Sequence, residues 1–335
     1  MEKLKVVSLF SGCGGTDLGI EGGFFYLGKE YKRHNTEIIF ANDIDKNACD
    51  IFNANFGAKC INSDIKDIDE DSISAHDILT GGFPCQSFSI VAQNPPRLGY
   101  KDKKGKLFFE MVRILKHKKP AVFIAENVKG ILSANKKKAF PLILLNFEEA
   151  GYKITWDILN AAEYGIPQKR ERVFIVGVRN DINYEFIFPS PTTKDTHVPL
   201  EKILLDDDKI PEKYFFSQRA VEGLLKSNQA MNKGRAQNIE KPCNTVGAHL
   251  AKISLNSTDP VIITKGKYRR FLPREVARIQ SFPDSFKLIG SETVQYRALG
   301  NAIPPVLMWH ITNEIIEQVF KGNRKYQKNS RIRGL

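Results

Sequence analysis

Short apolar runs alternate with amphipathic stretches along the first half of the chain. The apolar runs have the length of strands and cover residues 5–10, 37–41, 77–80, 120–125, 154–160 and 173–178. Apolar runs of this length predict strands that are buried on both faces of a sheet. Amphipathic helices are predicted between them, at residues 46–56, 106–118 and 136–150. Because strands and helices alternate, we predict an α/β fold with a doubly wound, mostly parallel, Rossmann-like sheet.

The alternation stops after Arg179. Residues 188–267 contain several prolines and the acidic run 206–208, but no strand–helix repeat. A short helix is predicted at residues 272–280 and a final amphipathic helix at 306–320. We therefore expect four parts, namely a large domain at 1–187, a smaller irregular domain at 188–270, a hinge at 271–295 that supports the smaller domain, and a segment at 296–335 that returns to the large domain.

The composition of the 335 residues is that of a globular protein with an excess of positive charge. Hydrophobic residues make up 42% and charged residues 26%, which is ordinary, whereas the formal net charge of +12 favours polyanionic partners. The five cysteines are scattered and form no Cys-x-x-Cys pair, which argues against a disulfide framework or a zinc site and fits a reducing, cytoplasmic environment. No apolar segment approaches the ~20 residues that span a bilayer, so we expect no membrane partner.

Glycines and acids stand at the ends of the first predicted strands. Gly12, Gly14 and Gly15 follow the strand at 5–10, Asp43 follows the next strand, and Asp64 follows a third apolar stretch. Glycines allow a ligand to approach the backbone, and an acid after the second strand can hydrogen-bond ribose hydroxyls. Each feature alone is also consistent with a tight turn or a helix cap. Together they favour a nucleoside pocket.

Reactive side chains follow later strands of the same sheet. Cys85 comes after the strand at 77–80 and two glycines, and a thiol held at the carboxyl end of a strand is a candidate nucleophile. Glu126 ends the next strand, where burial would suit it to general acid catalysis. Arg170 and Arg172 alternate as they enter a strand, so their side chains could grip a carbonyl, a phosphate or a carboxylate. The loop at 93–105 is either a mobile lid or a solvated surface loop.

Six separated motifs occur in a fixed order along the chain. They are FSGCGG at 10–15, GFPCQS at 82–87, ENV at 126–128, QKRER at 168–172, REVAR at 274–278 with FPD at 282–284, and GNA at 300–302. In these motifs the chain resembles the DNA (cytosine-5) methyltransferases of the bacterial restriction-modification type. The resemblance covers about residues 5–180 and 270–320, and the segment between them is the variable part of that family.

The resemblance implies a role for each of the candidate residues. Cys85 would add to C6 of a flipped-out cytosine, Glu126 would contact ring N3 and the exocyclic amine, Arg172 would hold the O2 carbonyl, and Arg170 would support the loop and cysteine. The implied cofactor is S-adenosyl-L-methionine, and no metal is implied. The residues that would contact S-adenosyl-L-methionine are Phe10, Gly12, Gly15, Asp43, Ile44, Asp64, Ile65, Pro84, Leu107, Asn301 and Ala302. Ile44 stands where relatives often have an aromatic residue, which would weaken stacking on adenine.

Double-stranded DNA is the partner that the resemblance implies, with residues 188–270 as the target-recognition domain. The expected DNA-binding residues are Gln86, Ser87, Gln168, Thr245, Arg269 and Arg270. Thr245 is followed by valine where the family often has leucine, which leaves its role open. We expect a cytoplasmic monomer that acts beside a separate cognate restriction endonuclease.

Other classes of protein share single features with this chain. Zinc cytidine deaminases also have a Pro-Cys motif, but they need a second cysteine where this chain has Phe88, and a His-x-Glu motif that it lacks. A nicotinamide dehydrogenase would leave Cys85, Glu126 and the two arginines unexplained. A transfer-RNA cytosine methyltransferase of the same fold remains an alternative, although the length of the segment 188–267 favours a reader of duplex DNA. A DNA-binding regulator built on an inactive scaffold is a further rival, and the intact Cys85, Glu126 and Arg172 argue against it.

Overall fold

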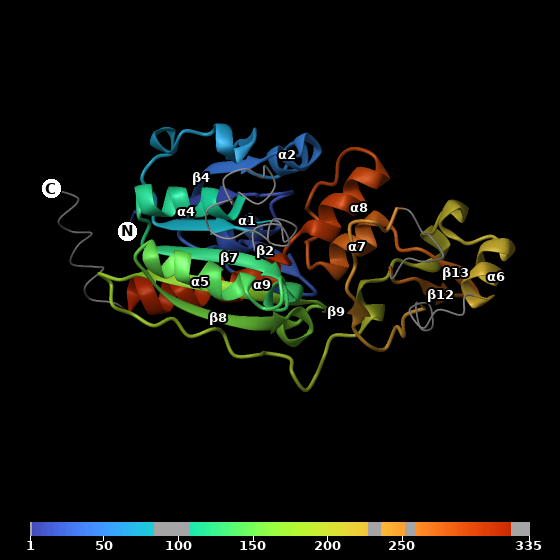
Figure 1. Ribbon diagram of the computed structural model, residues 1–335. Helices are drawn as coiled ribbons and strands as arrows, with labels where there is room; N and C mark the ends of the chain where they lie inside the picture. The colour runs from blue at the N-terminus through green and yellow to red at the C-terminus, as the bar shows by residue number, and fades with distance from the viewer. Residues whose placement is uncertain (1, 84–106, 227–235, 252–258, 323–335) are drawn as a thin grey trace.

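A seven-stranded sheet forms the centre of the molecule (Figure 1). The structure is a computed structural model that describes residues 2–83, 107–226, 236–251 and 259–322. In the order in which they lie in the sheet, its strands are β5 (Cys60–Asn62), β4 (Thr36–Asp43), β1 (Leu4–Leu9), β6 (Ile78–Gly81), β7 (Val122–Val128), β10 (Glu171–Arg179) and β8 (Tyr152–Asn160). Only β10 runs antiparallel to its neighbours in this sheet. The predicted α/β fold with a mostly parallel sheet is therefore confirmed.

Helices cover both faces of the sheet, which explains why its strands are apolar throughout. Adjacent residues of one strand serve opposite faces, so Val6 packs with α1 (Gly15–Glu21) and α9 (Pro305–Ile315), whereas Val7 packs with α4 (Leu107–Lys118) and α5 (Ala139–Glu149). Helix α2 (Lys46–Asn53) joins the first of these two cores. These helices lie within one to three residues of most predicted boundaries, although the final helix ends in a π-helical turn (Ile316–Lys321).

A small hairpin was missed by the sequence analysis. Strands β2 (Phe24–Tyr26) and β3 (Lys29–Tyr31) pair in an antiparallel way between α1 and β4, where no strand was predicted. Its Tyr31 packs edge-on against Trp309 of α9, with 5.3 Å between ring centroids. Two three-residue strands are too short to produce a recognisable alternation in the sequence.

The second half of the chain builds a smaller, irregular body beside the sheet (Figure 1). Its elements are the 3₁₀ turns Leu200–Ile203, Asp207–Lys209 and Glu212–Tyr214, helix α6 (Gln218–Lys226), the hairpin β12 (Ile262–Thr264) with β13 (Lys267–Arg269), and helices α7 (Pro273–Ile279) and α8 (Glu292–Asn301). A two-residue strand, β11 (Cys243–Asn244), pairs with β9 (Gln168–Lys169) and so joins this body to the sheet domain. The boundary that we expected between residues 295 and 296 falls inside α8, so hinge and C-terminal segment share one helix.

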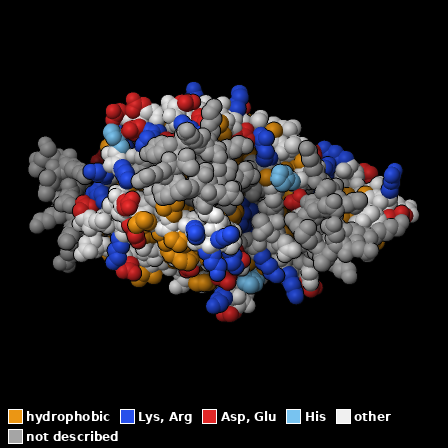
Figure 2. All heavy atoms as spheres, in the orientation of Figure 1, with side chains coloured by type: hydrophobic (Ala, Val, Ile, Leu, Met, Phe, Trp, Pro, Cys, Tyr) orange, Lys and Arg blue, Asp and Glu red, His pale blue; other side chains and the backbone are white. Residues whose placement is uncertain are grey.

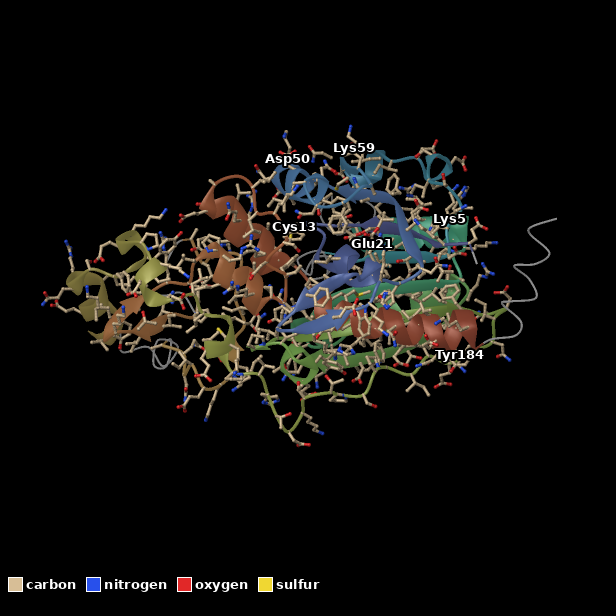
Figure 3. The ribbon with its side chains drawn as sticks, turned by 180° about the vertical axis from the view of Figure 1, so that it is seen from behind. Lys5, Cys13, Glu21, Asp50, Lys59 and Tyr184 are labelled. Carbon is tan, nitrogen blue, oxygen red and sulfur yellow. The ribbon has the colours of Figure 1, made fainter. Side chains whose placement is uncertain are left out.

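The carboxyl ends of the parallel strands face the smaller body. Strand β1 begins near Lys5, on the far side of the molecule, and leads to Cys13, which lies beside the helices of the smaller body (Figure 3). Cys13 shares a hydrophobic core with Phe271, Phe282 and Leu299 from that part of the chain. The residues that follow the strands therefore face the junction of the two bodies, which is where ligands bind in open α/β sheets.

Candidate active site at the carboxyl edge of the sheet

One cleft of about 740 Å³ lies at this edge of the sheet and is lined by most of the predicted site residues. Among them are Phe10, Gly12, Gly15, Asp43, Ile44, Asp64, Ile65, Leu107, Glu126, Arg170, Arg172, Asn301 and Ala302. Pro84, Cys85, Gln86 and Ser87 lie outside the described residues. The described chain enters that segment at Phe83, which itself lines the cleft.

The turn after β1 is held in a conformation that few side chains tolerate. Gly12 and Gly14 have φ values of 56° and 92°, and Phe10 between the strand and this turn has a φ of 54°. Left-handed backbone at a non-glycine residue is strained, and such strain concentrates at functional sites. A Cβ on Gly15 would lie only 2.3 Å from the carbonyl oxygen of Ile303. Glycine is therefore required for the close contact between this turn and the C-terminal segment.

The wall next to this turn combines a carboxylate with an apolar side chain. Asp43 ends β4, and its carboxylate accepts hydrogen bonds from the backbone N–H groups of Gly12 and Asp45, both at 2.8 Å. Ile44, the next residue, leaves 71% of its surface exposed in the cleft. A fixed carboxylate beside an exposed apolar side chain matches a ribose and the base that it carries.

Glu126 and Arg172 form an ion pair deeper in the cleft. Glu126 Oε1 lies 3.1 Å from Arg172 Nε, and the side chains are 14% and 13% exposed. Burial raises the pKa of the Glu126 carboxyl above its ordinary value, although the guanidinium groups of Arg172 and Arg170 oppose this. Burial likewise lowers the pKa of Arg172. The cost of removing both groups from water thus outweighs their attraction, so the pKa of Glu126 remains above its ordinary value.

Arg170 lies beside this pair but has a different environment. It is 3% exposed and donates to three carbonyl oxygens, those of Val246, Gly300 and Ala302, at 3.0–3.1 Å. Its Nη donors are thus occupied by the backbone, so Arg172 is the better placed of the two arginines to hold a carbonyl group of a ligand. Arg170 instead attaches the sheet domain to Val246 and to the end of α8 in the smaller body.

Comparison with known proteins gives the family of this chain. The model of the C-5 cytosine-specific DNA methylase family matches residues 4–317. The chain belongs to this family. Its enzyme class is therefore DNA (cytosine-5-)-methyltransferase, and the resemblance seen in the motifs is confirmed.

This methyltransferase is similar in sequence to bacterial type II methyltransferases. It is 37% identical to the type II methyltransferase M.FnuDI of Fusobacterium nucleatum, covering 94% of both chains. It is 34% identical to M.NgoFVII of Neisseria gonorrhoeae, covering 97% of this chain and 89% of the relative. Two solved structures, the Entamoeba histolytica methyltransferase EhMeth and the Schizosaccharomyces pombe (S. pombe) Dnmt2, share its fold with TM-scores of 0.74 and 0.72. Each is 19% identical and covers 95% of this chain, and the chain covers 99% of each.

Two residues that we expected to contact DNA are buried in the methyltransferase. Gln168 is fully buried, where its side chain accepts from Val246 N at 3.0 Å and donates to Gln280 Oε1 at 2.8 Å. Arg269 is also fully buried and pairs with Glu275 at 2.7 Å. In the structure described, the polar groups of both side chains are therefore satisfied by partners inside the protein rather than presented at the surface.

The other predicted DNA contacts are accessible to different degrees. Thr245 is exposed and donates to the carbonyl oxygen of Lys169 at 2.7 Å. The Arg270 guanidinium lies 4.9 Å from the centre of the Tyr214 ring and pairs with Glu292 at 3.6 Å. Thr245 thus stays at the junction that faces the cleft, while Arg270 is tied to α8 and its surroundings.

Two further residues of the site were missed by the sequence analysis. Asn127 donates to the carbonyl oxygen of Phe83 at 2.9 Å, so it fixes the backbone that leads to Pro84 and Cys85. Arg297 lines the cleft and pairs with Asp45 at 2.8 Å, which joins α8 to the start of α2. The sequence does contain a signal for each residue. Asn127 is adjacent to Glu126, and Arg297 lies four residues before Asn301, which places both on one face of a helix.

Neither a membrane-spanning helix nor a cluster of metal ligands occurs among the described residues. No helix among them has the length and apolar character that a membrane span requires. No group of three or more His, Cys, Asp or Glu side chains in these residues could hold a metal ion.

Proposed function

We propose that this methyltransferase transfers a methyl group from S-adenosyl-L-methionine to C5 of a cytosine in a specific short sequence of duplex DNA. The observation that carries the proposal is the single cleft in which the Glu126–Arg172 pair and the nucleoside wall around Asp43 meet. One cleft of about 740 Å³ offers room for a cofactor and a flipped base together.

The residues of the cleft fit the cofactor. Asp43 presents a fixed carboxylate to ribose hydroxyls, and the exposed Ile44 gives the adenine an apolar surface. Asn301 and Ala302, at the end of α8, close the pocket from the opposite side. When bound, S-adenosyl-L-methionine supplies an electrophilic methyl group on its sulfonium. The glycine turn would hold it close to the backbone.

The base would bind between the ion pair and the nucleophile. In this proposal, Arg172 donates to O2 of the cytosine, and the protonated Glu126 donates to ring N3. The Cys85 thiolate adds to C6, which makes C5 nucleophilic, and protonation at N3 stabilises the resulting adduct. After methylation, loss of the C5 proton expels Cys85 and restores the ring. Nearby guanidinium groups favour the ionised thiol that this step requires.

DNA would lie across the junction between the sheet domain and the smaller body. Residues 188–270 form the target-recognition domain in this proposal, and Thr245, Gln86 and Ser87 are candidate contacts beside the flipped base. Flipping costs a few kcal/mol, which contacts with the displaced strands must offset. The type II methyltransferase relatives support a protective role in a restriction-modification system. We propose that the enzyme acts as a cytoplasmic monomer, apart from its endonuclease.

The test is the identity of the modified base. The purified protein is incubated with labelled S-adenosyl-L-methionine and either genomic duplex DNA or transfer RNA, and the nucleosides are then analysed by mass spectrometry. We expect 5-methylcytosine in the DNA alone, and none with the Cys85→Ser variant. Methylation of transfer RNA but not of DNA would support the alternative of a transfer-RNA enzyme and refute the proposal.

A further inference from the structure

A strained turn with three lysines follows the strand that carries Glu126. The chain leaves the cleft at Val128, passes through a 3₁₀ turn (Lys129–Leu132) and reaches residues 135–138, which we name the lysine turn. Asn135, Lys136 and Lys137 all have left-handed backbone, with φ values of 48°, 51° and 67°. Left-handed conformation costs roughly 1–2 kcal/mol for each residue that is not glycine. Three such residues in succession are unusual in a turn that only joins two elements.

The lysines of this turn are exposed and have no acidic partner in the described part of the chain. Lys136, Lys137 and Lys138 are all exposed, and none of them forms an ion pair with another described residue. The neighbouring Lys129, in contrast, is neutralised by Glu171 at 2.9 Å. Lys and Arg side chains gather near the start of α5, in the middle of the face shown in Figure 2.

Several basic residues of the smaller body are paired with acids inside the molecule. Lys265 pairs with Asp208 and Arg270 with Glu292. Arg269 is buried against Glu275, and Lys267 lies over the ring of Phe215 at 5.7 Å. A paired cation presents little net charge to a phosphate, so these side chains contribute less to long-range attraction than the lysine turn does.

We propose that the lysine turn binds backbone phosphates of the duplex beside the flipped cytosine. The inference rests on the proposed function, since it assumes that duplex DNA occupies the junction. The turn begins seven residues after Val128, which lines the cleft at this edge of the sheet, and its three lysine side chains are exposed. Such contacts position the duplex without reading its sequence. The catalytic domain thus provides the phosphate grip, and the recognition domain is left to read the bases.

The experiment measures how salt weakens DNA binding. Binding of the full chain to a labelled duplex is followed by fluorescence anisotropy at several salt concentrations. The slope of log affinity against log salt concentration is negative, and each phosphate contact makes it steeper by about 0.9. The triple variant K136Q/K137Q/K138Q should have a slope shallower by about 2–3. It should lose affinity equally for cognate and unrelated duplexes, whereas K136R/K137R/K138R should keep the wild-type slope.

The control removes the same charge at the opposite edge of the sheet. K116Q/K118Q/K119Q changes three lysines at the end of α4, close to the amino end of β7, and should keep the wild-type slope. A wild-type slope in K136Q/K137Q/K138Q, or an equal change in the control, would overturn the inference. Wild-type methylation of the duplex is measured in parallel. If it is absent, the proposed function fails, whereas a normal rate with unchanged slopes refutes the lysine turn alone.

Discussion

Asp17 gives the most quantitative prediction. It lies in α1, directly after the glycine turn, and its side chain is fully buried. Neither carboxylate oxygen makes a hydrogen bond of normal geometry with the described residues. Burial raises the pKa of Asp17 from 3.8 to about 7, against a smaller opposing effect of the Ser8 hydroxyl. The carboxyl is therefore uncharged in the folded protein at a pH where it would ionise in the unfolded chain.

The sign of the effect on stability follows from this difference. Since the folded pKa lies above the unfolded value, the protonated group stabilises the fold fully below about pH 4. This contribution is lost as the pH rises to about 7 and stays lost above that. The difference of about three pH units corresponds to roughly 4 kcal/mol, at about 1.4 kcal/mol for each unit. Local relaxation of the ionised group makes this an upper value.

The variant Asp17→Asn removes the titration while keeping the size of the side chain. Its free energy of unfolding is measured by urea denaturation, followed by circular dichroism, at several values between pH 4.5 and pH 8. Relative to wild type, the variant should become more stable as the pH rises. Over the measured pH range, the difference in the free energy of unfolding should approach about 4 kcal/mol. Asp50→Asn, on the surface of α2, controls for the loss of one carboxylate. A difference between variant and wild type that is constant with pH would refute the reasoning.

Three further substitutions test the cleft itself. Glu126→Gln should lower kcat by about 10²–10⁴-fold. The kcat/KM of the wild type should fall as the pH rises through the raised pKa of Glu126, and the kcat/KM of the variant should not show this fall. Ile44→Ala should weaken cofactor binding by about five- to thirtyfold in calorimetry, because about 1–2 kcal/mol of apolar burial is lost. Gly300→Ala should cost about 1–3 kcal/mol in thermal unfolding, since its Cβ would lie 2.3 Å from the backbone of Gly247. Gly57→Ala, which has open space around it, is the matched control; equal losses in both would contradict the packing argument.

The sheet and the place of the cleft could be predicted because both follow from local pattern. Apolar runs such as 120–125 have no polar side, and only a strand covered on both faces accommodates them. Once those strands are parallel, the residues after them meet at one edge. Asp43 and Glu126 line the same cleft for this reason, although 83 positions separate them in the chain.

The orientation of single polar side chains could not be predicted in the same way. Gln168 and Arg269 are polar and lie near the junction, so the sequence favours contact with DNA. Each side chain is instead buried beside a polar partner. Gln168 bonds to Gln280, which is distant in the sequence, and Arg269 pairs with Glu275 in the next element, α7. Burial of a polar group depends on whether tertiary structure supplies a hydrogen-bond partner, and this cannot be read from a single sequence.

The junction between the two bodies depends on such partners. Gln280 donates to the carbonyl oxygen of Leu299 at 2.5 Å, and Arg170 donates to those of Gly300 and Ala302. The end of α8 that lines the cofactor pocket is thus attached to the same side chains that hold Val246 of the smaller body. In the proposed function, recognition and cofactor binding would therefore share one set of contacts, and the last motif of the chain would return to the first domain for this reason.

The most direct test of the account is covalent trapping of the enzyme. A duplex with 5-fluorocytosine at the target position is incubated with the protein and S-adenosyl-L-methionine, and the products are separated under denaturing conditions. Because fluorine at C5 cannot leave as a proton does, elimination of Cys85 is blocked, and we predict a stable protein–DNA adduct with wild type and none with Cys85→Ser. No adduct with a wild type that methylates the unsubstituted duplex, or an equal yield with Cys85→Ser, would contradict the assignment of Cys85 as the nucleophile.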